Sequence, residues 1–143
     1  MSKLTTSENE VFTDVVVLDY NDLITIGNGG QTTIGTIPAG GGVELVVVDE
    51  STAFAGTTSL VIDIGTTGAD PDEFIDALDV DAMTVPVANT GDAFTTSYSQ
   101  FVGAASADTP ILLEVTDAAI ASATAGEITI GLRIIDLRRF ASS

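Results

Sequence analysis

Apolar and polar side chains alternate along several short segments of this chain, and this pattern constrains the fold more than any other feature. Every second side chain of a β-strand points to the same face of its sheet. The alternation is clearest in residues 59–65, 110–116 and 127–137. One face of these segments would hold Leu60, Ile62, Ile64, Ile111, Leu113, Val115, Ile128, Ile130, Leu132 and Ile134. These segments are therefore expected to be half-buried strands.

Other segments add shorter strands. The continuous apolar run at residues 43–49 is typical of a strand that is covered on both sides or of an element in an interface. Pro86 places a further short segment at the edge of a sheet, because proline cannot donate to a strand ladder. Apolar or β-branched runs between Gly-rich turns predict strands at residues 15–18, 23–26, 31–37, 84–87 and 94–102.

Residues 71–78 predict the one convincing helix. Asp70 is a candidate N-cap, and Pro71 suits the first helical position. Phe74 and Leu78 would share one apolar face. A helix of about two turns is not stable alone, so it is expected to lie against a sheet or a barrel end.

These elements predict an all-β protein: an antiparallel β-sandwich or jelly roll with one short helix at about residues 71–78. The apolar phase of the last strand slips at Ile134 and Ile135, which indicates a bulge or bend there. Residues 1–12 are expected to form an N-terminal arm, and residues 13–143 a single β-sandwich domain. The arm lacks the apolar core of a signal peptide, so we expect synthesis in the cytoplasm of the producing cell.

The charge of the chain limits its functions. Twenty-one carboxylates face four Lys and Arg residues, for a formal net charge of −17, and the chain contains no Cys, His or Trp. Nucleic acids and anionic membranes need clustered cations, so neither is an expected partner. A Ser–His–Asp triad or a His-based metal site is impossible. We therefore predict no catalytic residues, no metal ligands and no cofactor, and a protein that is not an enzyme.

Six carboxylates between residues 70 and 81 form an acidic segment. Ca²⁺ binds six to eight oxygen ligands, so we compared this segment with an EF-hand loop. Asp70 and Asp72 fit the first and third positions, but Ile75 stands where glycine is required. A solvated loop at a helix N-terminus is the preferred interpretation, and a calcium-dependent binding or adhesion module is kept as an alternative.

The cations and the arm supply candidate contact residues. All three Arg residues lie in the last eleven positions of a strongly acidic chain. Arginine binds carboxylates in a bidentate manner and is enriched with aromatic residues at interfaces. The alternative is local pairing with Asp or Glu of the same chain. The predicted protein-interface residues are Leu4, Phe12, Arg133, Arg138, Arg139 and Phe140.

Three stretches of sequence carry a resemblance to a known class of proteins. They read TIPAGGGVEL at residues 36–45, TAFAGTTSLVIDIG at 52–65 and GADPDEFIDALDV at 68–80, and AGEITI at 125–130 is a weaker fourth. In this pattern the chain resembles small virion proteins of tailed bacteriophages. The two ends of the chain are not part of the shared pattern.

The resemblance implies a head-associated structural protein, such as a capsid decoration or cement protein with a β-sandwich or jelly-roll fold. Such a protein would stabilise the head by bridging subunits of the major capsid protein, often as a homotrimer, on the capsid surface of the virion. The resemblance defines no catalytic residues. A head–tail connector, a tail component or a fibre component of the virion is the alternative assignment.

Overall fold

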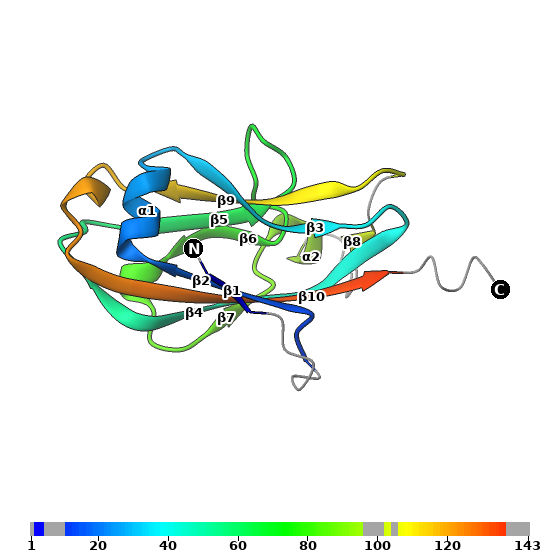
Figure 1. Cartoon of the computed structure of the whole chain (residues 1–143), viewed down its shortest axis with the longest axis horizontal. Coiled ribbons are helices and arrows are strands. Elements are labelled where there is room, and N and C mark those ends of the chain that lie inside the picture. Colours follow the sequence, from blue (N-terminus) through cyan, green and yellow to red (C-terminus); the bar gives the residue numbers. More distant parts are fainter. Residues whose placement is uncertain (1, 5–10, 96–101, 104–105, 137–143) are drawn as a thin grey trace.

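Two β-sheets pack face to face in this chain, and the computed structural model describes residues 2–4, 11–95, 102–103 and 106–136 (Figure 1). In spatial order the larger sheet contains β1 (Ser2–Leu4), β2 (Asp14–Asp19), β10 (Ala125–Asp136), β4 (Gly41–Ala55) and β7 (Val87–Ala88), and β8 (Val102–Gly103) also pairs with β4. The smaller sheet contains β3 (Gln31–Ile37), β9 (Thr109–Thr116), β5 (Val61–Gly65) and β6 (Ile75–Asp79). Neighbouring strands are antiparallel in both sheets, which confirms the predicted all-β sandwich.

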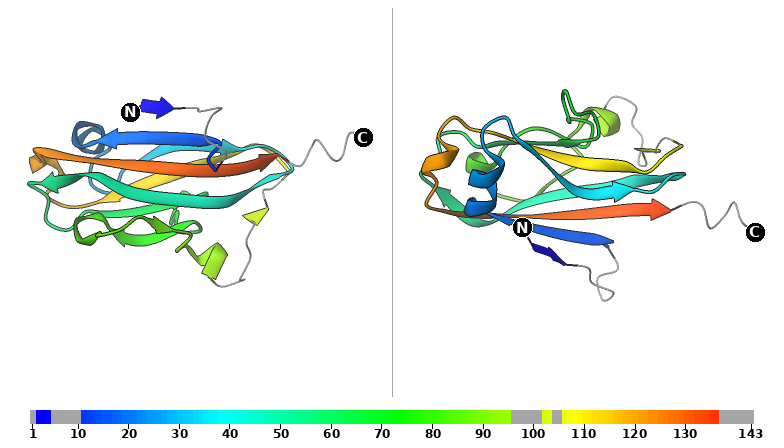
Figure 2. Two further views of the ribbon diagram at one scale, coloured as in Figure 1. Left: turned by 90° about the horizontal axis from the view of Figure 1, so that it is seen from below. Right: turned by 45° about the horizontal axis from the view of Figure 1, so that its top comes forward.

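The core lies between the two sheets, where the alternating segments meet (Figure 2). Each side chain that the alternation assigned to the inner face of β5, β9 or β10 is fully buried, apart from Ile134, which packs partly buried against the core. Val16 and Leu18 of β2 and Val46 and Val48 of β4 complete the inner face of the larger sheet. Aliphatic residues dominate this core because the chain has few aromatic ones.

The longest strand pair joins β4 to β10, and its register shifts at three points, one of which is a bulge at Glu44. Leu45 lies opposite Arg133, but the next pair is Val43 with Ile134, so Glu44 is the extra residue in β4. A bulge of this kind re-aims the extra side chain and bends the strand. The register of this pair shifts next to Ile134, but the extra residue lies in β4 and not in the last strand, where the bulge or bend was predicted.

The helix predicted at residues 71–78 is wrong, because this segment ends in the edge strand β6. Phe74 and the residues after it add to the edge of β5 instead of bonding within a helical turn. The Phe74 N–H donates to the Ile64 carbonyl at 2.9 Å, and the Ala77 N–H donates to the Asp63 carboxylate at 2.7 Å. Two turns of helix gain little by themselves, so strand pairing that also buries the Phe74 side chain is favoured.

A helix that the sequence analysis missed lies at α1 (Tyr20–Ile26), so the strand predicted at residues 23–26 is also wrong. Asp19 caps this helix: its carboxylate accepts from the Asp22 N–H at 2.9 Å, and the Asp22 carboxylate accepts from the Asp19 N–H at 3.0 Å. This reciprocal pair is a capping box with aspartate at both positions. Gly27 ends the helix with a positive φ of 80°.

The remaining helical segments are short. α2 (Asp92–Thr95) overlaps the start of the strand predicted at residues 94–102, so that strand is wrong at its start, and residues 96–101 lie outside the described residues. Two 3₁₀ turns, η1 (Val80–Ala82) and η2 (Ile120–Ser122), connect strands. No helix within the described residues is both long and apolar enough to cross a membrane.

Two predictions about sheet edges concern the arm and Pro86. The strand predicted at residues 84–87 is correct only at Val87: residues 84–86 are not a strand, and β7 begins after Pro86 and lies at the edge of the larger sheet. At the opposite edge, β1 pairs with β2, and Leu4 lies opposite Val15 (Figure 2). Part of the predicted arm is thus a strand, while residues 5–10 lie outside the described residues. The division at residue 12 stays a prediction.

Candidate protein-interaction surface

The outward side of the larger sheet combines a half-buried apolar centre with one arginine. In β2, β10 and β4, the positions between the core-facing residues point away from the smaller sheet. Gly131 lies at the centre of this side, with Val15 on one neighbouring strand and Val47 on the other. We call this side the outer face, and its residues include Val15, Val17, Glu44, Leu45, Val47, Asp49, Thr129, Gly131 and Arg133.

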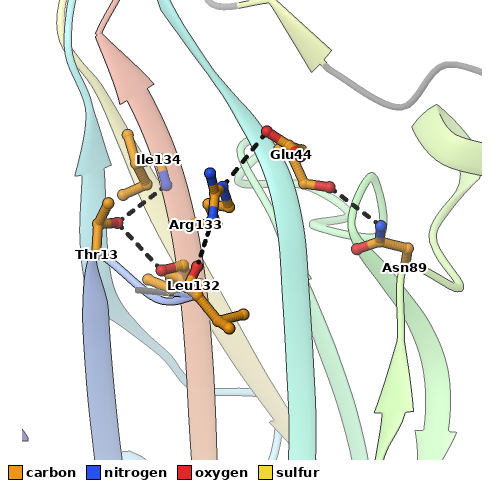
Figure 3. A network of polar contacts seen from close by, with 7 residues as sticks. Thr13, Glu44, Asn89, Leu132, Arg133 and Ile134 are labelled. Atoms are coloured by element: carbon orange, nitrogen blue, oxygen red, sulfur yellow. Dashed lines mark hydrogen bonds and ion pairs between the residues drawn. The ribbon is translucent and has the colours of Figure 1, made fainter. Parts of the chain in front are cut away.

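Phe12 lies on the outer face because Gly131 leaves room for its ring. A Cβ atom at Gly131 would lie 2.5 Å from ring carbon Cε1 of Phe12. The next residue, Thr13, fixes the approach of this segment to β10 (Figure 3). Its N–H and hydroxyl donate to the Leu132 carbonyl at 2.8 and 3.1 Å, and its hydroxyl accepts from the Ile134 N–H at 3.0 Å. The segment before β2 is therefore anchored across the outer face.

Arg133, which is part of β10, also binds this segment (Figure 3). Its Nη1 donates to the Val11 carbonyl at 3.2 Å, and its Nε lies 3.5 Å from Oε2 of Glu44. The side chains of Arg133 and Glu44 are 39% and 44% exposed, so both remain accessible to a second molecule. The bulge in β4 makes this ion pair possible, because Glu44 is its extra residue.

Asn89 blocks the edge of β4 beside the outer face. Its Oδ1 accepts from the Val46 N–H at 2.9 Å, and its Nδ2 donates to the Glu44 carbonyl at 3.1 Å (Figure 3). Its φ of 51° turns the chain so that the amide reaches the strand. The Asn89 side chain thus satisfies backbone groups of β4 between its pairings with β7 and β8, where the edge of the strand would otherwise be open.

The structure brings two of the predicted interface residues together. Phe12 and Arg133 both lie on the outer face, and the backbone of Leu4 pairs with Val15 of the same sheet. Arg133 also forms the local pair that the alternative hypothesis described. The other three predicted residues, Arg138, Arg139 and Phe140, lie outside the described residues.

Sequence reasoning missed Glu44 and Asn89. Glu44 interrupts the apolar run of β4 between Val43 and Leu45, and this was the available signal for it. Asn89 lies in a loop without any pattern that points to the strand edge it serves. Its role follows only from the packing of residues that are distant in the sequence.

The acidic segment folds into a cluster that differs from the predicted one. Asp72 and Asp76 meet Asp92, and one carboxylate oxygen from each lies within 4.8 Å of the others. Asp92 comes close because its N–H donates to the Asp72 carbonyl at 3.2 Å. Loss of hydration and then the charge and hydrogen bonding of Asp92 raise the pKa of Asp72. Among the described residues, these three carboxylates are the group that suits a hard cation, and a calcium role stays a hypothesis.

Glu73, next to this cluster, has a structural role. Its carboxylate accepts from the Thr66 and Thr67 N–H groups, at 3.2 and 2.8 Å. Partial burial acts to raise the pKa of Glu73, but these hydrogen bonds outweigh it, and the pKa is lowered. Glu73 therefore holds the loop that leads from β5 to β6.

Together, these observations define an antiparallel β-sandwich whose distinctive surface is a sheet face crossed by an anchored chain segment. No known protein-family model and no curated protein matches the sequence. The solved structures that share the fold include two from phage capsids. A chain described as the capsid asymmetric unit of cyanophage Pam1 has a TM-score of 0.58 and 15% identity, covering 92% of this chain and 91% of that one.

The second is a chain described as the capsid of Ralstonia phage GP4, with a TM-score of 0.55 and 14% identity, covering 92% of this chain and 90% of that one. At these identities the likeness shows a shared fold. The shared fold extends over nearly the whole of each chain. The predicted resemblance to phage virion proteins is therefore confirmed at the level of the fold.

Proposed function

We propose that this chain is a non-enzymatic structural protein of a bacteriophage virion that decorates the capsid. The observation that carries the proposal is the shared fold with chains from two phage capsid structures, over 92% of this chain in both. The virion-like sequence at residues 36–80 supports the same assignment independently of the fold.

In this role the protein bridges neighbouring subunits of the major capsid protein and strengthens the head. The outer face supplies a suitable contact, because half-buried Val15 and Val47 lie beside the accessible guanidinium of Arg133. Aromatic and arginine side chains at the centre of a contact carry much of its binding energy. A capsid repeats such a contact many times, so each one need be only modest in strength.

The assembly that we propose is a homotrimer on the capsid surface, formed after synthesis in the host cytoplasm. A chain without cysteine folds equally well in a reducing compartment. Threefold symmetry suits a site between capsid subunits, whereas a sixfold or twelvefold ring would place the chain at the head–tail junction. Reconstruction of purified particles with this chain located distinguishes the two.

The test of the bridging role is occupancy on purified heads that lack the chain. The variants Phe12→Ala and Arg133→Ala are compared with the wild type and with Thr116→Ala, an exposed position at the end of β9 in the smaller sheet. Reduced occupancy for the first two variants with normal occupancy for Thr116→Ala supports the proposal. Failure of the wild-type chain to bind heads of its own phage would refute it.

A further inference from the structure

The turn between α1 and β3 contains an asparagine that is directly followed by a glycine. Of the four asparagines in the chain, Asn28 alone has this neighbour, because the other three precede Glu, Asp or Thr. Asn28 and Gly29 are both exposed, and a Cβ atom at Gly29 would have nothing within 4 Å. Glycine has no Cβ to hinder its own backbone nitrogen. An asparagine before glycine is therefore the kind most prone to lose its side-chain amide.

The loss of this amide is an intramolecular substitution. The backbone nitrogen of Gly29 gives up its proton and attacks Cγ of Asn28. A new N–C bond forms, the bond from Cγ to the side-chain amide breaks, and the amide leaves with the proton as ammonia. Water then opens the cyclic imide at one of its two carbonyls, which gives aspartate or isoaspartate. The reaction needs only water, which reaches this exposed turn.

The folded turn restrains both reacting groups at the end of β9 (Figure 1). The Gly29 N–H donates to the Val115 carbonyl at 2.7 Å. Oδ1 of Asn28 accepts from the Asp117 N–H at 3.0 Å. The first bond must open before the nitrogen can give up its proton, and the second fixes the orientation of the side chain. The hydrogen bonds that attach the turn to β9 therefore also keep the asparagine from reacting.

The glycines around Asn28 set the shape of this turn. The Gly30 N–H donates to the Gly27 carbonyl at 3.0 Å and closes four residues. Gly29, the third of them, has a φ of 76°, as a type II turn requires at that position. A Cβ atom at Gly30 would collide with the backbone carbonyl of Ile26. A side chain at residue 30 would thus displace the turn without changing the Asn28–Gly29 dipeptide.

We propose that Asn28 is a deamidation site that the folded turn keeps unreactive and that local opening of the turn exposes. An exposed turn at the end of a sandwich opens more easily than the core unfolds. The rate of reaction is then the fraction of open turns multiplied by the rate of the free dipeptide. This site goes beyond the proposed role on the capsid and does not depend on it.

The products loosen the attachment of the turn to β9. Asp117 is 4% exposed, and its carboxylate accepts from the Thr58 and Ala119 N–H groups at 3.1 and 2.9 Å. An aspartate at residue 28 adds a second negative charge beside this buried residue, and two carboxylates that share a site repel each other. Isoaspartate also lengthens the backbone within the turn. Asn28→Asp, which reproduces the first product, is therefore expected to lower the midpoint of thermal unfolding.

The experiment follows the reaction in the purified full-length chain by mass spectrometry of its peptides. The chain is incubated at mildly alkaline pH, either folded or in guanidinium chloride. In denaturant we expect Asn28 to react ahead of the other three asparagines. In the folded chain we expect it to react at least roughly tenfold more slowly than in denaturant. Equal rates in the two states, or no reaction in denaturant, would overturn the proposal.

Three glycine variants separate the shape of the turn from the dipeptide. Gly30→Ala displaces the turn, so it is expected to raise the rate in the folded chain toward the rate in denaturant. Gly68→Ala is the matched control, because it is the same substitution in an exposed loop with nothing within 4 Å, and it should react like the wild type. Gly29→Ala removes the dipeptide and should suppress the reaction even in denaturant.

Circular dichroism checks that each variant folds. A folded Gly30→Ala chain that reacts no faster than the wild type contradicts the proposal, and so does a Gly68→Ala chain that reacts as fast as Gly30→Ala. If Gly30→Ala does not fold, the comparison of the folded and denatured wild type decides, together with Gly29→Ala.

Discussion

The Nε atom of Arg133 lies 3.5 Å from Oε2 of Glu44, and the bulge in β4 is what brings the two residues together. Without the extra residue, a side chain at position 44 would alternate to the inner face of the strand. The bulge therefore moves one carboxylate out of the core and places it beside the one described arginine on the outer face. This arrangement neutralises a charge next to the proposed contact surface.

The first prediction separates the local and intermolecular roles of Arg133. Because both partners are substantially exposed, Glu44→Gln should change the free energy of unfolding by less than about 1 kcal/mol. Arg133→Ala should have a similarly small effect on unfolding but reduce binding to heads. Urea denaturation and particle occupancy measure the two effects. If both variants bind like the wild type, Arg133 is only a local partner.

The second prediction concerns the contact between Gly131 and the Phe12 ring. Gly131→Ala places a methyl group against the Phe12 ring, and overpacking of this kind typically costs about 1–3 kcal/mol. We expect the lower end of that range, since Phe12 is half-buried and the ring is able to shift. In a Phe12→Ala background the same substitution should be nearly neutral. A double-mutant cycle by thermal denaturation tests this coupling, and additive effects would contradict the contact.

The third prediction concerns Asn89. Asn89→Ala removes both side-chain hydrogen bonds to β4 and should cost about 1–3 kcal/mol, because the Val46 N–H loses its partner. Asn89→Gly also loses these bonds but accommodates the φ of 51° without strain. It should therefore be less destabilising than alanine by about 1 kcal/mol. Equal stability of the two variants would show that the backbone conformation adds no cost.

The fourth prediction is a pH dependence at the acidic cluster. The raised pKa of Asp72 means that its contribution to stability is present below the unfolded-state pKa and is lost as the pH rises through the folded-state value. Asp72→Asn removes the repulsion from Asp92. It should thus stabilise the protein more at pH 7 than at pH 3. Thermal unfolding at both pH values measures this, with Asp70→Asn as the control, and a stabilisation independent of pH would contradict it.

The fifth prediction has the opposite sign, at Glu73. Its lowered pKa gives stability that is present above the unfolded-state pKa and is lost as the pH falls through the folded-state value. Glu73→Gln weakens charge-assisted hydrogen bonds to Thr66 and Thr67, at a cost of about 1–2 kcal/mol at pH 7. The cost should shrink in acid. A loss of stability that persists below pH 3 would assign Glu73 a packing role instead.

The strands with a full alternating pattern were predictable, because burial of one sheet face imposes that pattern directly. β5, β9 and β10 are examples. The segment at residues 71–78 was not predictable as a strand, since its Asp-Pro-Asp-Glu start also favours a helix N-terminus. Pairing with β5 decided its conformation, and that partner lies outside any local window. In the same way, α1 was hidden because its β-branched residues read as a strand, although the Asp19–Asp22 capping pair was visible in the sequence.

The surface residues were predictable in part. Arg133 stood out as one of few cations, and Phe12 as an aromatic residue in a polar arm. Glu44 and Asn89 were not predictable in their roles. The position of a bulge depends on the register between β4 and β10, and the reach of Asn89 depends on a loop that packs against a distant strand. Register and loop packing are tertiary properties that one-dimensional patterns do not encode.

The close packing of the Phe12 ring over Gly131 should help to recognise relatives of this chain. Two positions near opposite ends of the sequence share one small volume, so a bulkier residue at one must be matched by a smaller one at the other. In distant proteins of this fold, where overall identity has fallen to about 15%, that compensation should persist as correlated change between the two positions.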